Sequence, residues 1–164
     1  MSIRFYRAED LPLLYRINQA AVPGVGAETE AGLQTWLTLS TCFVACDPED
    51  LPIGFITLMP LGLRAYTSPN MRWFESYAAR TSRALIYVDR IAVRPDLRGQ
   101  GIGDALYHAA FEHCDQATQI GCEVNVLPPT PGSHRFHTRL GFHKVGEQVF
   151  VPGAKSVAYY VRDL

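Results

Sequence analysis

Apolar residues follow two different spacings on either side of a glycine-rich segment in the middle of the chain. Residues 85–93 form an almost continuous apolar run, which is typical of a buried strand. Beyond the glycines, apolar positions recur at intervals of three and four residues, which predicts a helix. These positions are Ile102, Ala105, Leu106, Ala109, Ala110 and His113. We therefore expect a strand, a turn at Pro95, a glycine loop and then a helix.

The same patterns predict helices and strands along the rest of the chain. Further helices are expected at Leu11–Ala21, Glu28–Leu39, Met71–Arg80 and Pro131–Leu140. The helix after the glycine loop is expected to end near Gln119–Gly121. Further strands are expected from Ile3, at Thr41–Cys46, Ile53–Met59, Glu123–Leu127, Lys144–Val151 and Ser156–Arg162. Gly54, inside one of these strands, indicates a bulge or a close contact.

The glycine loop, Arg98–Gly103, stands where a helix is expected to begin. The first N–H groups of a helix have no partner inside the helix, and the helix dipole favours negative charge there. Glycines also let a phosphate group approach the backbone closely. The segment therefore suits an anion, although a plain turn between strand and helix would leave the same pattern.

Spacing excludes two common nucleotide-binding motifs at this loop. A dinucleotide fingerprint would need another glycine where Asp104 stands. A P-loop would need a lysine and a serine or threonine after its last glycine, and neither follows Gly103.

Composition and charge limit the class of protein further. At 164 residues, without a repeat or a linker, we expect a single domain over residues 1–164. The chain is 48% hydrophobic with a formal net charge of −1, which suits a soluble globular protein and gives no electrostatic footprint for nucleic acid. No apolar run has the length of a membrane span, and the N-terminus lacks a signal peptide, so we expect a cytoplasmic protein without a membrane partner. The four cysteines lack paired metal spacing and are expected to be reduced, mostly buried thiols; they are Cys42, Cys46, Cys114 and Cys122.

Two blocks of sequence resemble the GNAT acetyltransferase superfamily. The first is Arg98-x-x-Gly101-x-Gly103 after an Ile-Ala-Val strand, which is similar to the family's pyrophosphate-binding motif for coenzyme A. The second is SHRFHTRLGF, residues 133–142, which resembles the second signature of the family. Asn125 matches the asparagine of the family's Glu-Val-Asn strand. Thr130, an expected N-cap, stands where many members have asparagine.

The resemblance is strong from Tyr87 onward and rests on element order before it. It implies an α/β (α+β) fold with a mixed, mostly antiparallel twisted sheet, helices on both faces and two splayed central strands. The pantetheine arm of coenzyme A would fit between Leu85–Val93 and Glu123–Leu127, and acetyl-CoA would be the acyl donor. The residues implied to bind it are Ile91, Ala92, Val93, Arg98, Gly99, Gln100, Gly101, Ile102, Gly103, Asn125, Ser133 and Phe136.

Acetylation of an amine requires a group that removes a proton. An amine with the lysine pKa of about 10.4 is unprotonated in only about one molecule in a thousand at pH 7. Asp89 is the candidate base, because it lies in an apolar strand where some family members carry a catalytic glutamate. A water relay or a purely structural ion pair of Asp89 is the alternative. Arg90 is expected to be a poor partner, because neighbouring strand residues face opposite sides.

His137 stands where the family usually has the tyrosine that protonates the departing thiolate, so it is the candidate acid. Histidine titrates near pH 6.5 and can donate or accept a proton. A packed histidine on a helix face is the alternative. The spacing of His134, His137 and His143 would permit a metal ion, but no acidic or cysteine partner is obvious, so no metal is expected.

The function implied is transfer of an acetyl group from acetyl-CoA to a primary amine of a small molecule or an amino acid, by direct attack in a ternary complex. A protein or peptide N-acetyltransferase and a non-catalytic acyl-CoA-binding regulator are the alternatives. The aromatic segment Pro60–Arg83 is expected to cover a small acceptor, although its aromatic residues could simply pack on the core. Its candidate substrate residues are Tyr66, Trp73 and Tyr77. A monomer or a homodimer is expected.

Overall fold

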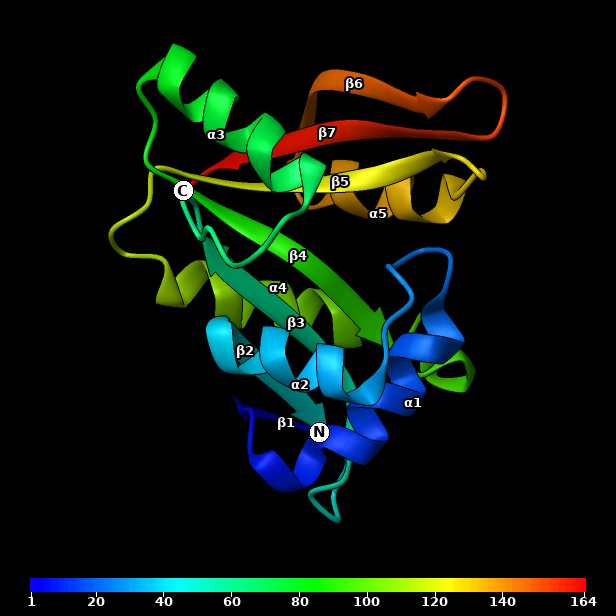
Figure 1. Ribbon diagram of the computed structural model, residues 1–164. Helices are drawn as coiled ribbons and strands as arrows, with labels where there is room; N and C mark the ends of the chain where they lie inside the picture. Colours follow the sequence, from blue (N-terminus) through cyan, green and yellow to red (C-terminus); the bar gives the residue numbers. More distant parts are fainter. The chain divides into compact units, whose positions relative to one another are not determined.

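The computed structural model describes residues 1–164 and contains seven strands (Figure 1). They are β1 (Ser2–Phe5), β2 (Thr41–Cys46), β3 (Pro52–Pro60), β4 (Leu85–Val93), β5 (Gln119–Leu127), β6 (His143–Val151) and β7 (Lys155–Asp163). Their order in the sheet is β1-β2-β3-β4-β5-β7-β6. β4 pairs with β5 in parallel, whereas β1/β2, β2/β3, β5/β7 and β6/β7 are antiparallel. The expected mixed, mostly antiparallel sheet is confirmed.

Five α-helices and two short 3-10 helices connect the strands. They are α1 (Leu11–Ala21), α2 (Glu30–Leu39), α3 (Pro69–Thr81), α4 (Ile102–His113), α5 (Pro131–Arg139), η1 (Ala8–Asp10) and η2 (Pro95–Leu97). Every helix is too short or too polar to cross a lipid bilayer.

The chain divides into two compact units by its internal contacts. The first unit consists of Met1–Met59 and Val88–Asp115, and the second of Pro60–Tyr87 and Gln116–Leu164. Most of β4 therefore belongs to the first unit together with β1 to β3, while its first three residues belong to the second with β5, β6 and β7. The expectation of a single domain stays a prediction.

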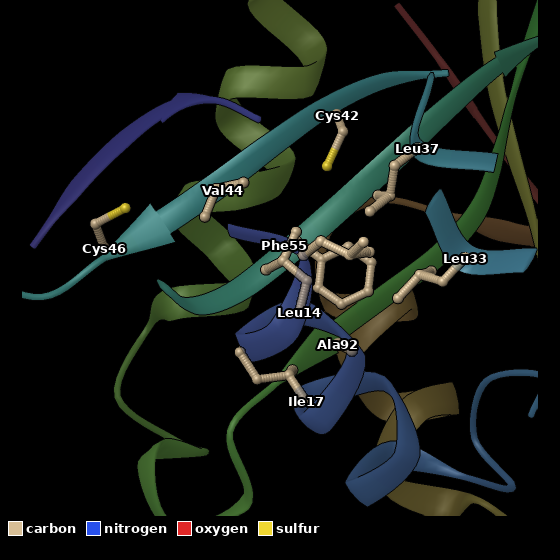
Figure 2. Packing of buried hydrophobic residues seen from close by; sticks show 10 residues of the cluster. Leu14, Ile17, Leu33, Leu37, Cys42, Val44, Cys46, Phe55 and Ala92 are labelled. Carbon is tan, nitrogen blue, oxygen red and sulfur yellow. The ribbon is translucent and has the colours of Figure 1, made fainter. Parts of the chain in front are cut away.

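In the first unit, the two faces of β2 bind different helices. Cys42, Val44 and Cys46 alternate along the strand and pack in one apolar cluster with residues of α1 and α2 (Figure 2). Phe43 points to the opposite face, where the ring of His113 from α4 meets it edge-on at 5.4 Å. Because successive strand residues face opposite sides, six residues suffice to hold helices on both faces.

In the second unit, two neighbouring tyrosines of β7 bind α3 and α5 on opposite faces. Tyr159 stacks on Trp73 of α3 with ring centroids 3.9 Å apart. Tyr160 donates a hydrogen bond to Nδ1 of His134 on α5 at 2.9 Å. The predicted arrangement of helices on both faces of the sheet therefore holds in each unit.

Most predicted boundaries are confirmed within one or two residues. α1 and β2 cover the predicted residues, and β6 and β7 form the expected hairpin. α2 begins at Glu30, later than predicted, because Thr29 is its N-cap and accepts a hydrogen bond from the N–H of Gly32 at 3.0 Å.

One boundary prediction is wrong: α4 ends at His113, and residues 119–121 belong to β5. These residues pair with Leu85–Tyr87 on one side and with residues 161–163 of β7 on the other. Gly121 does not end a helix. It leaves room for α3, since a Cβ at Gly121 would lie 2.6 Å from Cε1 of Phe74.

Candidate active site

The glycine loop lies between β4 and α4, within the first unit. After β4, the single turn η2 brings the chain to Arg98. Gly99 and Gly101 have φ angles of +77° and +79°, a conformation that costs a residue with a side chain about 1–2 kcal/mol. Gly101 is the N-cap of α4, and its carbonyl accepts the N–H of Ala105 at 3.0 Å. The glycines are therefore needed to bend the chain into the helix.

The space above the loop is open. A Cβ at Gly99 or Gly101 would meet no heavy atom within 4 Å. The first N–H groups of α4 have no partner within the helix, and the dipole places partial positive charge there. Arg98 is exposed beside them and adds a full positive charge, as Gln100 adds a polar side chain. These residues fit a pyrophosphate group, and their predicted role in binding coenzyme A stays a prediction.

Gly54 of β3 sets how closely the end of β4 and the start of α4 approach that strand. A Cβ at Gly54 would lie 3.0 Å from the carbonyl oxygen of Ala92 and 3.2 Å from Cγ2 of Val93. It would also lie 3.3 Å from Cγ2 of Ile102, the first residue of α4. The register of β2 and β3 shifts beside Ala45, the partner of Gly54. Both the bulge and the close contact predicted at Gly54 are thus confirmed.

Asp89, the candidate base, lies on β4 with its side chain 3% exposed. Nε of Arg90 donates a hydrogen bond to Oδ2 of Asp89 at 2.6 Å. The prediction that Arg90 is a poor partner is therefore wrong. The two Cβ atoms leave the strand on opposite sides, but the arginine side chain is long enough to bend back to its neighbour. Because both side chains are buried, the low local dielectric strengthens this hydrogen bond once it has formed.

The same guanidinium contacts two side chains that sequence reasoning missed. Nη1 of Arg90 donates to Oδ1 of Asn18 on α1 at 3.0 Å, and Nη2 lies 3.4 Å from Oε1 of Glu28. Nε1 of Trp36 donates to that same carboxylate oxygen at 3.1 Å. An arginine inside an apolar strand was the signal that could have found this cluster, since a buried charge needs partners.

His137, the candidate acid, is buried in the second unit at 3% exposure. Its ring packs edge-on against Phe136 and Phe142, and its Nδ1 donates to the carbonyl oxygen of Ser133 at 2.8 Å. Burial lowers the pKa of His137 from 6.5 to about 4; the bond to Ser133 opposes this shift and the charge of His134 adds to it. The imidazole is therefore neutral at pH 7.

α5 is held against β5 at the carbonyl oxygen of Asn125. Thr130 occupies the predicted N-cap position, but its hydroxyl does not cap the helix. It donates instead to this carbonyl oxygen at 2.7 Å, and Nε2 of His134 donates to the same atom at 2.9 Å. Ser133 and Phe136 lie half-buried on the same helix. The second predicted block and Asn125 are thus brought together, whereas Ile91–Val93 and the glycine loop belong to the first unit.

The candidate substrate residues also lie in the second unit. Trp73 stacks on Tyr77 and on Tyr159, with ring centroids 5.5 Å and 3.9 Å apart. Tyr66 is 9% exposed, and its carbonyl oxygen accepts a hydrogen bond from Arg72. This packing matches the alternative expectation for the aromatic segment, and a contact of these residues with a substrate stays a prediction.

Sequence reasoning also missed a half-buried polar cluster around Glu123. The hydroxyl of Tyr87 donates to Oε2 of Glu123 at 2.8 Å, and Nδ2 of Asn70 donates to Oε1 at 3.1 Å. The hydroxyl of Tyr159 lies 2.8 Å from the amide oxygens of Asn70 and Gln148. Burial and the charge of Glu123 raise the pKa of Tyr159. The partners come from distant parts of the sequence, so only Glu123 in its apolar strand gave a signal.

A comparison with protein families decides the class of the protein. The sequence model of the acetyltransferase (GNAT) family matches residues 11–142, which include β4, the glycine loop and α5. The chain belongs to the GNAT acetyltransferase family. Transfer of an acetyl group from acetyl-CoA is the chemistry of this family, and the predicted resemblance is confirmed.

Relatives and solved structures agree with the GNAT assignment. An uncharacterized N-acetyltransferase of Methanocaldococcus jannaschii is 28% identical over 102 residues; the match covers 62% of this chain and 39% of that relative, so the chain spans about two fifths of its length. The ribosomal-protein-S18-alanine N-acetyltransferase of Escherichia coli superposes with a TM-score of 0.72 at 16% identity, covering 99% of this chain and 92% of that one. A phosphinothricin acetyltransferase of Sinorhizobium meliloti in complex with AcCoA gives 0.72 at 22% identity, covering 99% and 88%. At these identities the likeness shows the shared fold.

Proposed function

We propose that this GNAT protein transfers an acetyl group from acetyl-CoA to a primary amine of a small molecule or an amino acid. The start of α4 carries the proposal. Two glycines there adopt positive φ, the space above them is open, and Arg98 is exposed beside the first N–H groups of the helix. A phosphate group gains most at such a position, because the donors and the dipole are already fixed.

Residues of β4 and of the glycine loop would have separate roles in this reaction. Acetyl-CoA would supply the acetyl group as a thioester. The glycine loop and Arg98 would hold its pyrophosphate by N–H donors and charge. A backbone N–H of Ile91–Val93 would stabilise the charge that builds on the carbonyl oxygen during attack. Asp89 would take the proton of the ammonium, directly or through a water molecule.

Departure of the thiolate depends less on a protein acid than attack by the amine depends on a base. A free thiol has a pKa near 8.5, so a thiolate is an acceptable leaving group near neutral pH. His137 has a pKa of about 4, so roughly one molecule in a thousand would carry the imidazolium at pH 7. We therefore propose that water protonates the thiolate and that His137 is a packing residue.

Calorimetry with coenzyme A tests the binding site. Gly101→Asp places a side chain and a negative charge in the loop, and we expect the Kd for coenzyme A to rise by tenfold or more. Gly153→Asp is a matched control, because Gly153 has a φ of +71° and equally open surroundings in the β6–β7 turn. Equal affinity in Gly101→Asp and the wild type would contradict the loop assignment.

Release of thiol from acetyl-CoA tests the reaction and the acceptor class. We expect turnover with single amino acids or small amines at higher kcat/KM than with peptides that carry the same amino group. Turnover confined to peptides would replace this proposal by a peptide N-acetyltransferase. Tight binding of acetyl-CoA without turnover on any amine would favour a non-catalytic acyl-CoA-binding regulator.

A further inference from the structure

Arg90 joins three separate segments of the first unit inside the protein. Its guanidinium is 3% exposed. It contacts Asp89 on its own strand, Asn18 on α1 and Glu28 in the segment that leads into α2, at 2.6, 3.0 and 3.4 Å. Two of these three partners, Asp89 and Glu28, are carboxylates. The third, Asn18, is a neutral amide.

The backbone of Arg90 is fixed as well as its side chain. Its N–H donates to Oγ1 of Thr57 on β3 at 3.2 Å, and the same hydroxyl lies 3.5 Å from its carbonyl oxygen. Thr57 is 1% exposed, so this contact is buried. With the backbone and the guanidinium both held, the position of Nε is determined, and so is the position of the Asp89 oxygen that it binds.

The segment between α1 and α2 depends on the same group. Asn18 donates to the carbonyl oxygen of Gly26 at 3.1 Å while it accepts from Arg90. Glu28 accepts from Trp36 and lies against Arg90. This segment has no regular secondary structure between Val25 and Thr29. The guanidinium is therefore one contact of this segment with β4, beside the packing of Val25 on the apolar cluster that includes Ala92.

We propose that Arg90 is a positioning residue for acetyl transfer, which orients the Asp89 carboxylate and holds Glu28 beside it. This inference rests on the proposed function, in which Asp89 takes a proton. A carboxylate in a fixed charge-assisted pair has a defined orientation.

Arg90→Lys tests the proposal, because it keeps the positive charge and loses the fork of donors. We expect kcat for the best amine of the acceptor panel to fall by about tenfold or more, while the Kd for coenzyme A stays within about twofold. A merely structural arginine would lower thermal stability and leave kcat of the folded protein unchanged.

Arg4→Lys is the matched control in the same unit. Arg4 also pairs with a buried carboxylate, that of Asp10 at 2.8 Å, and Asp10 has no proposed role in the reaction. It should lower stability without changing kcat. If Arg90→Lys fails to fold, Asn18→Ala replaces it and should lower kcat by about threefold at constant coenzyme A affinity.

The outcomes separate this inference from the proposed function. A wild-type protein that acetylates no amine overturns both. A wild-type enzyme with normal turnover in Arg90→Lys, or in Asn18→Ala where that variant is used, overturns only the positioning role.

Discussion

Gly54 of β3 and Ala92 of β4 approach so closely that a Cβ at Gly54 would lie 3.0 Å from the carbonyl oxygen of Ala92. Ala92 cannot simply move away, because it is 3% exposed and part of the apolar cluster of the first unit. Ile102, where α4 begins, contacts the same position at 3.3 Å. The absence of a side chain at Gly54 therefore sets the distance from β3 to the strand and helix that flank the glycine loop.

We expect Gly54→Ala to lower the free energy of unfolding by about 1–3 kcal/mol, the usual cost of overpacking a core. The Kd for coenzyme A should rise too, because β4 and α4 carry the residues proposed to bind it. Urea unfolding and calorimetry measure the two effects. Gly26→Ala is the control, since a Cβ at Gly26 would meet nothing within 4 Å. Wild-type affinity in Gly54→Ala would show that the loop does not depend on this contact.

His137 should make the protein less stable in acid. Burial lowers its pKa to about 4 in the folded chain, against 6.5 when it is unfolded. Between these values the unfolded chain binds the extra proton, so the stabilisation is complete above pH 6.5 and is lost as the pH falls toward 4. The full difference is about 3 kcal/mol. Urea unfolding at several pH values should show this slope in the wild type and not in His137→Phe.

The same variant decides whether His137 is the acid. A phenyl ring fills the pocket between Phe136 and Phe142 but can donate no proton. Because the buried imidazole is neutral and its Nδ1 proton points to Ser133, we expect His137→Phe to keep kcat within about threefold. A loss of about 10²-fold in a folded variant that still binds coenzyme A would instead establish a general acid.

The fold could be predicted where local residues determine an element. The buried residues Leu11, Leu14 and Ile17 of α1 follow helical spacing, and β2 is a short, nearly continuous apolar run. Gly141 has a φ of +85° at the end of α5, as its predicted place there requires. The error at Gly121 has a physical cause. A glycine after a helical pattern usually indicates the end of the helix. Here the missing side chain makes room for Phe74 of α3, and the local sequence does not indicate that contact.

The candidate site could be predicted only where local sequence determines the backbone. Gly99 and Gly101 are set by local backbone conformation, so their spacing was readable. Two partners of Arg90, Asn18 and Glu28, lie 72 and 62 residues away in the sequence. Alternation of strand side chains gave the wrong answer for Asp89 and Arg90, because the rule describes Cβ directions and not the reach of a long side chain.

Gly121→Ala should destabilise the protein by about 1–3 kcal/mol, because the added Cβ would lie 2.6 Å from the fully buried ring of Phe74. Gly132→Ala is the same substitution in α5 of the same unit, where a Cβ meets nothing within 4 Å. It should raise stability by about 0.5–1 kcal/mol through better helix propensity. Thermal unfolding of both variants checks the opposite signs, and equal effects would contradict the packing assigned to Gly121.

The proposed base is tested by Asp89→Asn, which keeps the shape of the side chain and removes its basicity. We expect kcat to fall by about 10²-fold or more, with the Kd for coenzyme A nearly unchanged, because the glycine loop and Arg98 carry that affinity. Loss of a buried ion-pair partner of Arg90 also lowers the stability of the fold, so a control variant must share that effect.

Asp10→Asn is such a control, since Asp10 is 3% exposed and paired with Arg4 at 2.8 Å in the same unit. It should lower stability and leave kcat unchanged. If Asp89→Asn turns over like the wild type, the proton of the amine leaves through water or another residue, and the Asp89–Arg90 pair serves only the fold.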